Sequence, residues 1–176
     1  MPHPTAKRLA LAASLLCALL TTMPPTSSAH SNVQPLSMQG TWVMTAAYEI
    51  LADGTRTTNY GEHPNGLLMA DASGRYSLQI FRPDRAKFAS GVKARGTADE
   101  YRDAVMGSST HTGRIHVDSV RGKLTFDIET ASYPNWEGTQ QVRDYVFENG
   151  TLTYSVPASA SGNGTIAYSI WQRAGA

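Results

Sequence analysis

The sequence predicts an all-β fold, an eight-stranded up-and-down antiparallel β-barrel with one short helix between strands three and four. Short runs of β-branched and aromatic residues recur along the chain, separated by turn residues about every eight to twelve positions. Several connections are short and rich in glycine, which is typical of hairpins between neighbouring antiparallel strands. Eight sequential strands that pair in this way can close on themselves and leave no exposed edge.

Eight runs of residues have the character of strands. In chain order they span residues 40–51, 66–71, 75–82, 111–118, 123–131, 139–148, 151–156 and 165–173. The fifth run alternates most clearly, because Leu124, Phe126 and Ile128 are apolar while the residues between them are polar. Asn149-Gly150 is the strongest hairpin signal, since both residues tolerate a positive φ. Neighbouring strands are therefore expected to pair in sequence order.

One segment departs from the strand pattern. Thr97 and Glu100 form a capping box, in which each side chain can accept a hydrogen bond from the backbone N–H of the other residue. Apolar residues follow at helical spacing, and Gly107 can end the helix, so we expect about two to three turns. A long irregular stretch, residues 83–96, precedes it. A loop of that length is either a solvated connector or a functional element.

The N-terminus has the pattern of a secretory signal peptide. Lys7 and Arg8 precede an apolar run, residues 9–20, which is too short to span a membrane. A polar stretch with small residues follows and ends at Ala29. We expect cleavage before His30, which would deliver the protein to the periplasm or the exterior.

The mature chain is expected to be a single domain, residues 30–176, because its 147 residues suffice for one core. The single cysteine, Cys17, lies in the leader, so no disulfide or thiolate metal site is available. The formal net charge of +1 argues against a nucleic-acid partner and against membrane association after processing. No cofactor and no metal are expected, and the partner is predicted to be a small molecule.

Several motifs, in order and spacing, resemble the lipocalin-like domain family of small bacterial and fungal barrel proteins. They are Gly40-Thr41-Trp42, Gly66-Leu67-Leu68-Met69, Arg82-Pro83-Asp84-Arg85, Thr97 to Tyr101, Pro134-Asn135-Trp136-Glu137-Gly138-Thr139 and Trp171-Gln172-Arg173. The resemblance covers nearly the whole mature chain and implies a lipocalin-like barrel. It also implies that Arg173 lies across Trp42 as a structural plug at the closed end, where a cation over an indole contributes about 0.5 to 2 kcal/mol.

The candidate ligand site is the sixth strand and the turn before it. One face of this strand carries two hydrogen-bonding and two aromatic side chains, namely Gln141, Arg143, Tyr145 and Phe147. Arg143 can bind an acidic group with its fork of donors. The alternative is an outward-facing Arg143 paired with Glu129 or Asp127 across the sheet.

Two further segments offer ligand contacts. In the turn, Tyr133 and Trp136 bracket Asn135, so a flat ligand could stack there, although Pro-Asn is also ordinary turn chemistry. The long loop is basic and could draw an anionic ligand to the barrel mouth, with Arg82 as its first member. The alternative is a solvated charge run.

The sequence shows no convincing catalytic constellation. His111 and His116 lie on opposite faces of one strand and cannot chelate a metal together. The best candidates for proton transfer are Glu129, Tyr133 and Arg143.

Two hypotheses therefore remain for the function. The first is an exported protein that binds a small hydrophobic or aromatic, largely apolar molecule in the barrel lumen. The second, implied by the resemblance, is a cyclase or isomerase that acts on a polyketide-like molecule in the same lumen. A lumen lined only by apolar groups would favour carriage, and a buried glutamate beside Arg143 would favour the enzyme.

Overall fold

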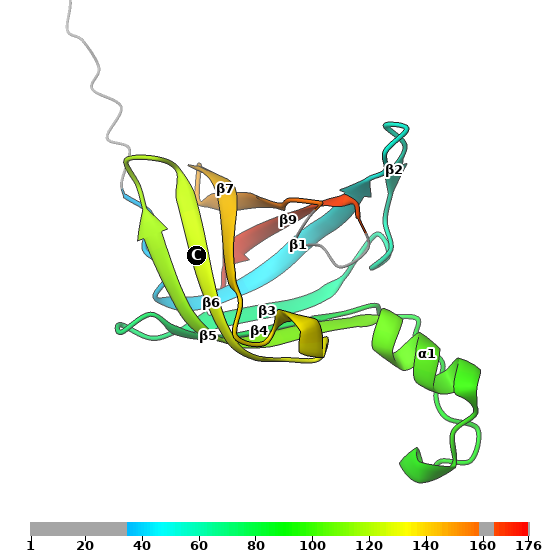
Figure 1. Ribbon diagram of the computed structural model, residues 1–176. Coiled ribbons are helices and arrows are strands. Elements are labelled where there is room, and N and C mark those ends of the chain that lie inside the picture. The colour runs from blue at the N-terminus through cyan, green and yellow to red at the C-terminus, as the bar shows by residue number, and fades with distance from the viewer. Residues whose placement is uncertain (1–34, 159–163, 176) are drawn as a thin grey trace, which may run out of the picture. The chain divides into compact units, whose positions relative to one another are not determined.

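The chain folds into a closed antiparallel β-barrel (Figure 1). The computed structural model describes residues 35–158 and 164–175. Each of the eight long strands pairs with the next long strand in the chain, and β1 pairs with β9 to close the barrel. The strands are β1 (Gly40–Ile50), β2 (Arg56–Thr57), β3 (Asn65–Ala70), β4 (Arg75–Phe81), β5 (Ser108–Asp118), β6 (Lys123–Ala131), β7 (Gln140–Glu148), β8 (Thr151–Val156) and β9 (Ile166–Arg173). The predicted all-β barrel is confirmed.

The expected leader, residues 1–29, lies outside the described residues, and so does the expected cleavage site before His30. Within the two described ranges, no helix is long and apolar enough to cross a membrane. Export therefore stays a prediction from the sequence.

The helix, α1 (Ala98–Met106), begins at the predicted capping box. The Thr97 hydroxyl accepts from the Glu100 N–H at 3.2 Å, and the Glu100 carboxylate accepts from the Thr97 N–H at 2.7 Å. Its predicted place between the third and fourth strands is wrong, because it follows β4. The difference arises from β2, a ninth strand of two residues that pairs with the end of β1. A strand this short has no periodicity that a sequence pattern could show.

Two irregularities in the strands decide which side chains enter the lumen. In β1, Met44 pairs with Trp171 while Ala46 pairs with Ile170, so Thr45 is an extra residue. This bulge reverses the alternation beyond it and turns Ala47 and Glu49 inward, where both are buried.

A second bulge lies between β5 and β6. Thr112 pairs with Thr130 and Gly113 with Ile128, so Glu129 has no partner in the register. Gly113 is required here, because a Cβ at this position would lie 1.9 Å from the carbonyl oxygen of Asp127. A bulge of this kind bends the strand and increases its local twist.

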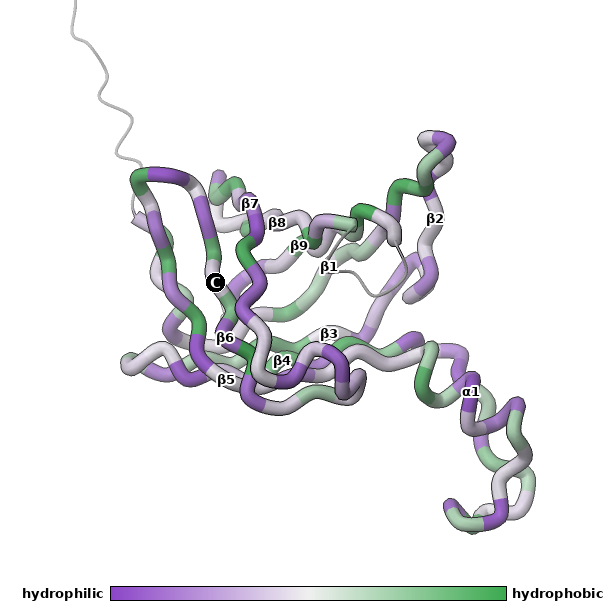
Figure 2. The backbone as a smooth tube through the Cα atoms, in the orientation of Figure 1, coloured by the Kyte–Doolittle hydropathy of each residue, from purple (hydrophilic) through white to green (hydrophobic). Residues whose placement is uncertain are grey.

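Side chains fill the barrel from its middle to one end. Figure 2 shows hydrophobic and hydrophilic residues alternating along the strands, as expected where one face meets the core. The largest fully buried side chains are Trp42, Trp171, Tyr154, Phe126, Leu68, Leu78, Leu124 and Leu152. Leu36 and Met38, which precede β1, are also buried. Among the described residues, this end of the lumen is therefore occupied by side chains.

The filled end is closed by Trp42 and Arg173. The Arg173 guanidinium lies 4.5 Å from the Trp42 ring centroid and donates to the carbonyls of Gln39, at 2.7 Å, and Ser37. The Trp42 indole donates to the Met38 carbonyl at 3.0 Å. The indole N–H of Trp42 and the guanidinium of Arg173 are therefore both paired with backbone that precedes β1.

Candidate functional site

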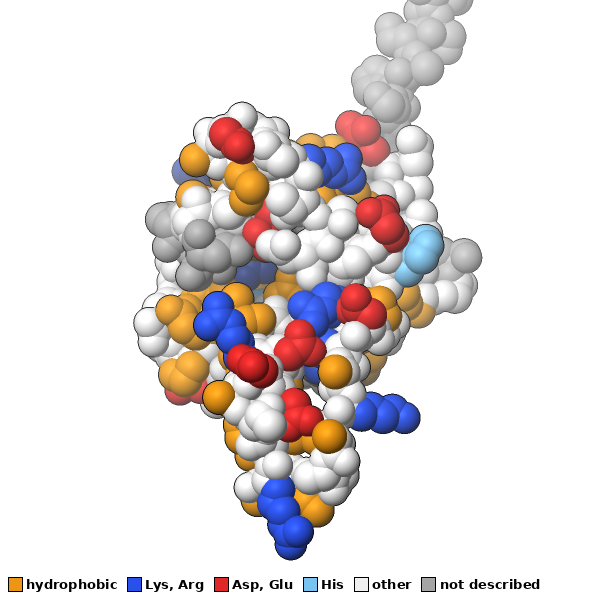
Figure 3. Space-filling model, turned by 90° about the vertical axis from the view of Figure 1, so that its right-hand side faces the viewer, with side chains coloured by type: hydrophobic (Ala, Val, Ile, Leu, Met, Phe, Trp, Pro, Cys, Tyr) orange, Lys and Arg blue, Asp and Glu red, His pale blue; other side chains and the backbone are white. Residues whose placement is uncertain are grey.

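A cavity lies at the opposite end of the barrel, where β1 ends and β9 begins. Its walls are mostly apolar or aromatic side chains from β1, β4, β8 and β9, together with Trp136 of the short helix η2 (Pro134–Trp136). The polar members are Glu49, Asn59, Ser109, His111, Arg143 and Ser169. Figure 3 views the molecule from this end and shows acidic and basic side chains interspersed around a hollow.

The enclosed volume is about 70 Å³. Pockets for drug-sized ligands are larger, roughly 300 to 1,000 Å³. A ligand would therefore place a group of a few heavy atoms inside the cavity and its larger part in the mouth.

Arg143 lies at the inner end of this cavity with only 3% of its surface exposed. Its guanidinium lies 4.0 Å from the Phe126 ring centroid and 5.1 Å from that of Tyr154. Nη2 donates to Gln141 Oε1 at 2.8 Å, whereas Nε has no hydrogen-bond partner. Within the described residues, Arg143 makes no ion pair. Burial lowers the pKa of Arg143, because desolvation disfavours the charged form.

His111 enters the lumen from β5 and is also 3% exposed. Burial holds its pKa well below the ordinary value, and the charge of Arg143 acts in the same direction, so the imidazole is neutral. The Tyr76 hydroxyl lies 2.6 Å from His111 Nδ1. Burial raises the pKa of Tyr76, so its hydroxyl keeps its proton. In the tautomer in which this hydroxyl donates to Nδ1, the imidazole proton is on Nε2, which makes no hydrogen bond among the described residues.

Two more buried polar atoms lack a hydrogen-bond partner, the Tyr154 hydroxyl and the Trp171 indole nitrogen. Burial raises the pKa of Tyr154, and the neighbouring polar groups of Arg143, Ser169 and Trp171 act in the opposite direction. Buried polar atoms without partners are rare and call for an explanation.

Glu49 lines the cavity on the side of β1 and is 7% exposed. Its carboxylate accepts from Asn59 Nδ2 and from Thr165 Oγ1, each at 2.9 Å. These bonds tie the loop after β1 and the segment before β9 to the cavity wall. The cavity thus has a hydrogen-bonded carboxylate in one wall and an arginine in another.

A family model for the lipocalin-like domain matches residues 39–174, which is nearly all of the described chain. The chain belongs to the lipocalin-like domain family. The resemblance drawn from its motifs is confirmed. No curated protein is significantly similar to the chain.

Two of the residues expected to contact a ligand, Trp136 and Arg143, line the cavity together. Gln141 is buried beside Arg143 and holds its guanidinium, but it does not line the cavity. Tyr145 faces the same side of β7 yet lies nearer the closed end and outside the cavity lining. Strand β7 therefore turns the predicted face inward, and of the four predicted residues on this face only Arg143 lines the cavity.

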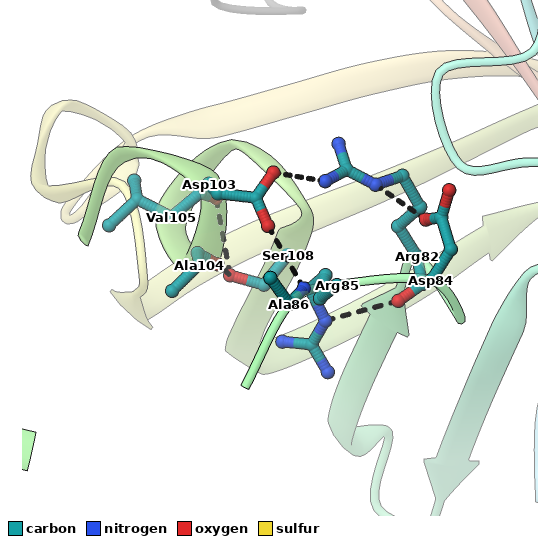
Figure 4. A network of polar contacts seen from close by, with 8 residues as sticks. All are labelled: Arg82, Asp84, Arg85, Ala86, Asp103, Ala104, Val105 and Ser108. Carbon is teal, nitrogen blue, oxygen red and sulfur yellow. Dashed lines mark hydrogen bonds and ion pairs between the residues drawn. The ribbon is translucent and has the colours of Figure 1, made fainter. Parts of the chain in front are cut away.

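Arg82 and Asn135 are engaged elsewhere. Figure 4 shows the Arg82 guanidinium between Asp84, with 2.8 Å from Nε to Oδ1, and Asp103 of α1. These ion pairs fix the base of the segment between β4 and β5, and Arg82 does not line the cavity. Asn135 donates to the Tyr133 hydroxyl at 3.0 Å on the exposed rim. The rim contacts order the turn that carries Trp136.

Glu129 lies on the outer surface, where its carboxylate pairs with Arg75 at 2.8 Å. It therefore cannot act on a molecule in the lumen. The outward alternative for Arg143 is also wrong, because Arg143 is buried inside while Asp127 pairs outside with His116 at 3.0 Å. Strand β6 alternates, so Asp127 and Glu129 share its solvent face.

Tyr133, the remaining candidate for proton transfer, is 38% exposed and does not line the cavity. Its ring packs edge-on against Trp136, with the centroids 5.5 Å apart. Its place is the rim of the site. Among the residues that the structure describes, no three histidine, cysteine, aspartate or glutamate side chains gather into a possible metal site.

The residues of the site that the sequence patterns missed include Glu49, His111 and Tyr154. Tyr154 lies on a short strand with regular alternation, so an inward tyrosine could have been found. The opposite faces of His111 and His116 were predicted, but nothing indicated which of them points inward. The inward orientation of Glu49 could not be predicted, because the bulge at Thr45 lies between it and the start of β1 and reverses the alternation of the residues that follow.

Proposed function

We propose that this lipocalin-like protein binds a small, largely apolar molecule in the open end of its barrel lumen. One observation carries the proposal, namely a cavity with mostly apolar walls into which a buried arginine projects that makes no ion pair among the described residues. Ligand sites in proteins commonly combine such walls with a few fixed polar groups. In this proposal Arg143 binds the enclosed end of the ligand, and Trp136 covers its exposed part at the mouth.

Binding in this lumen is tested with N-phenylnaphthylamine (NPN), a neutral apolar dye that fluoresces when it leaves water. Ala47→Phe would fill the cavity from β1 and should abolish the fluorescence increase. Ala46→Phe is the matched control, because the neighbouring residue faces the other side of the strand. Equal NPN binding by both variants would contradict a site in the lumen.

The proposal includes export to the periplasm or the exterior, based on the signal-peptide pattern of residues 1–29. Intact mass measured on the extracytoplasmic fraction should give a chain that begins at His30. The same sample, sprayed under native conditions, should carry the mass of a co-purifying small molecule. A retained leader in that fraction would contradict export.

A cyclase or isomerase in the same lumen is the second candidate. A buried carboxylate, Glu49, and a neutral imidazole, His111, line the cavity together with Arg143, and such groups can move protons. The co-purified molecule, incubated with the protein in deuterated water, would then be rearranged or gain deuterium on carbon. A Glu49→Gln variant should lose that exchange. A ligand that stays unchanged supports binding alone.

A further inference from the structure

We propose that the enclosed end of the ligand is an anionic oxygen group, a carboxylate or sulfonate held by Arg143 with the Tyr154 hydroxyl and His111 Nε2 as further donors. This inference rests on the proposed function and specifies its ligand class. It also sets the orientation of the ligand, with the acid inside and the apolar body toward Trp136.

The charge balance of the lumen supports an anion. Arg143 is buried and lies against two aromatic rings, and the hydrogen bond that it makes among the described residues is to a neutral amide. The acids of the neighbouring strand β6 are paired on the outer surface. Glu49 is bound by Asn59 and Thr165 at the cavity wall. A buried charge without a partner is costly, so the missing counter-charge is best supplied by the ligand.

The hydrogen-bonding groups around Arg143 point to the same chemistry. Arg143 Nε and the Tyr154 hydroxyl are buried without partners. His111 turns Nε2 toward the cavity, because Tyr76 occupies its other ring nitrogen, and Nε2 carries the proton in the tautomer in which Tyr76 donates to Nδ1. Donors thus project from β5, β7 and β8, and all three side chains line the cavity. Ordered water could accept from these donors but would not neutralise the guanidinium.

The size of the cavity fits this orientation. A cavity volume of about 70 Å³ suits a carboxylate or sulfonate, and the larger part of the ligand is placed at the mouth. There the Trp136 ring, which packs edge-on against His111 with centroids 6.0 Å apart, offers an aromatic wall. An acid-bearing aromatic molecule would therefore satisfy both ends of the site.

A matched pair of dyes tests the inference. Anilinonaphthalene sulfonate (ANS) carries a sulfonate on the skeleton of neutral NPN. A charge-assisted hydrogen bond of this kind corresponds to about ten- to a hundredfold in affinity, so ANS should bind that much tighter than NPN. Arg143→Met should remove this preference, so that ANS binds no tighter than NPN to the variant. Arg75→Met, which removes an arginine of the outer face, is the control and should keep the preference.

Tyr154→Phe gives a second test that does not depend on the folding of the Arg143 variant. It deletes only a hydroxyl without a hydrogen-bond partner, and it should weaken ANS severalfold more than NPN. If NPN binds in the lumen but ANS binds no tighter, the proposed function stands and the anionic ligand class is wrong. If neither dye binds, the proposed function itself fails.

Discussion

The two ends of the barrel each hold an arginine against an aromatic ring, but the two arginines differ in their partners. At the closed end, Arg173 lies over Trp42 and donates to two backbone carbonyls. In the open half, Arg143 lies over Phe126 and Tyr154, is almost fully buried, and has a donor without a partner.

This difference separates stability from function. A cation–π contact with satisfied donors contributes to folding, and nothing about Arg173 requires a further partner. A buried cation without a counter-charge works against folding, and a chain retains such a group most readily where a ligand completes it. The closed end is therefore the structural part of the barrel, and the open half is the part that we expect to bind.

The largest expected effect is a difference in stability between variants of two tryptophans, Trp42 at the closed end and Trp136 at the open end. Trp42 is fully buried, so Trp42→Ala should lower the free energy of unfolding by about 3 to 5 kcal/mol. Trp136→Ala should cost much less, because this ring is only partly buried, but it should weaken the binding of NPN. Denaturant unfolding and dye titration of both variants measure the contrast. Equal losses of stability would remove the distinction between the ends.

A pH dependence is expected from the open half. The pKa of His111, which faces Tyr76 and Arg143, is lowered in the folded state, so below about pH 6.5 the unfolded chain binds a proton that the folded chain excludes. The free energy of unfolding should then fall by up to about 1.4 kcal/mol per pH unit as the pH drops.

His111→Gln should remove this part of the pH dependence, measured by denaturant unfolding between neutral and mildly acidic pH. His116→Gln, which changes an exposed histidine of the outer face, is the matched control and should keep it. A slope that survives in His111→Gln would show that another group carries it.

The smallest expected effect concerns the two arginines directly. Arg173→Met should lower the free energy of unfolding by about 1 kcal/mol, the usual value for an accessible cation–π contact. Arg143→Met should leave the ligand-free protein equally stable or make it more stable, because an apolar side chain replaces an unpaired buried charge. Thermal unfolding of both variants without ligand is the measurement. A greater loss for Arg143→Met would mean that this residue is structural as well.

The barrel could be predicted because its strands alternate and its hairpins use turn residues. Leu124, Phe126 and Ile128 are indeed buried, and Asn149 and Gly150 form the predicted turn with φ of 51° and 76°. The helix could be predicted because its cap depends only on local hydrogen bonds.

The site could be predicted only in part, because alternation gives the face of a residue but not its depth in the barrel. Arg143 and Tyr145 share a face, yet two residues along a strand span about 6.6 Å, enough to leave Tyr145 outside the cavity. The inward position of Glu49 was not predicted, because one extra residue at Thr45 reverses the face on which each later residue of β1 lies. Both errors arise from three-dimensional register, which a single sequence does not show.

The most direct test follows the side-chain Nε–Hε signals of the two arginines by NMR during titration with ANS. Spectra of Arg143→Met and Arg173→Met assign the two signals. The Arg143 signal should shift as ANS binds, because its Nε has no partner in the ligand-free protein, and the Arg173 signal should stay in place. Binding that leaves the Arg143 signal unmoved, or that moves the Arg173 signal instead, would contradict the assignment of the ligand site to the open half of the barrel.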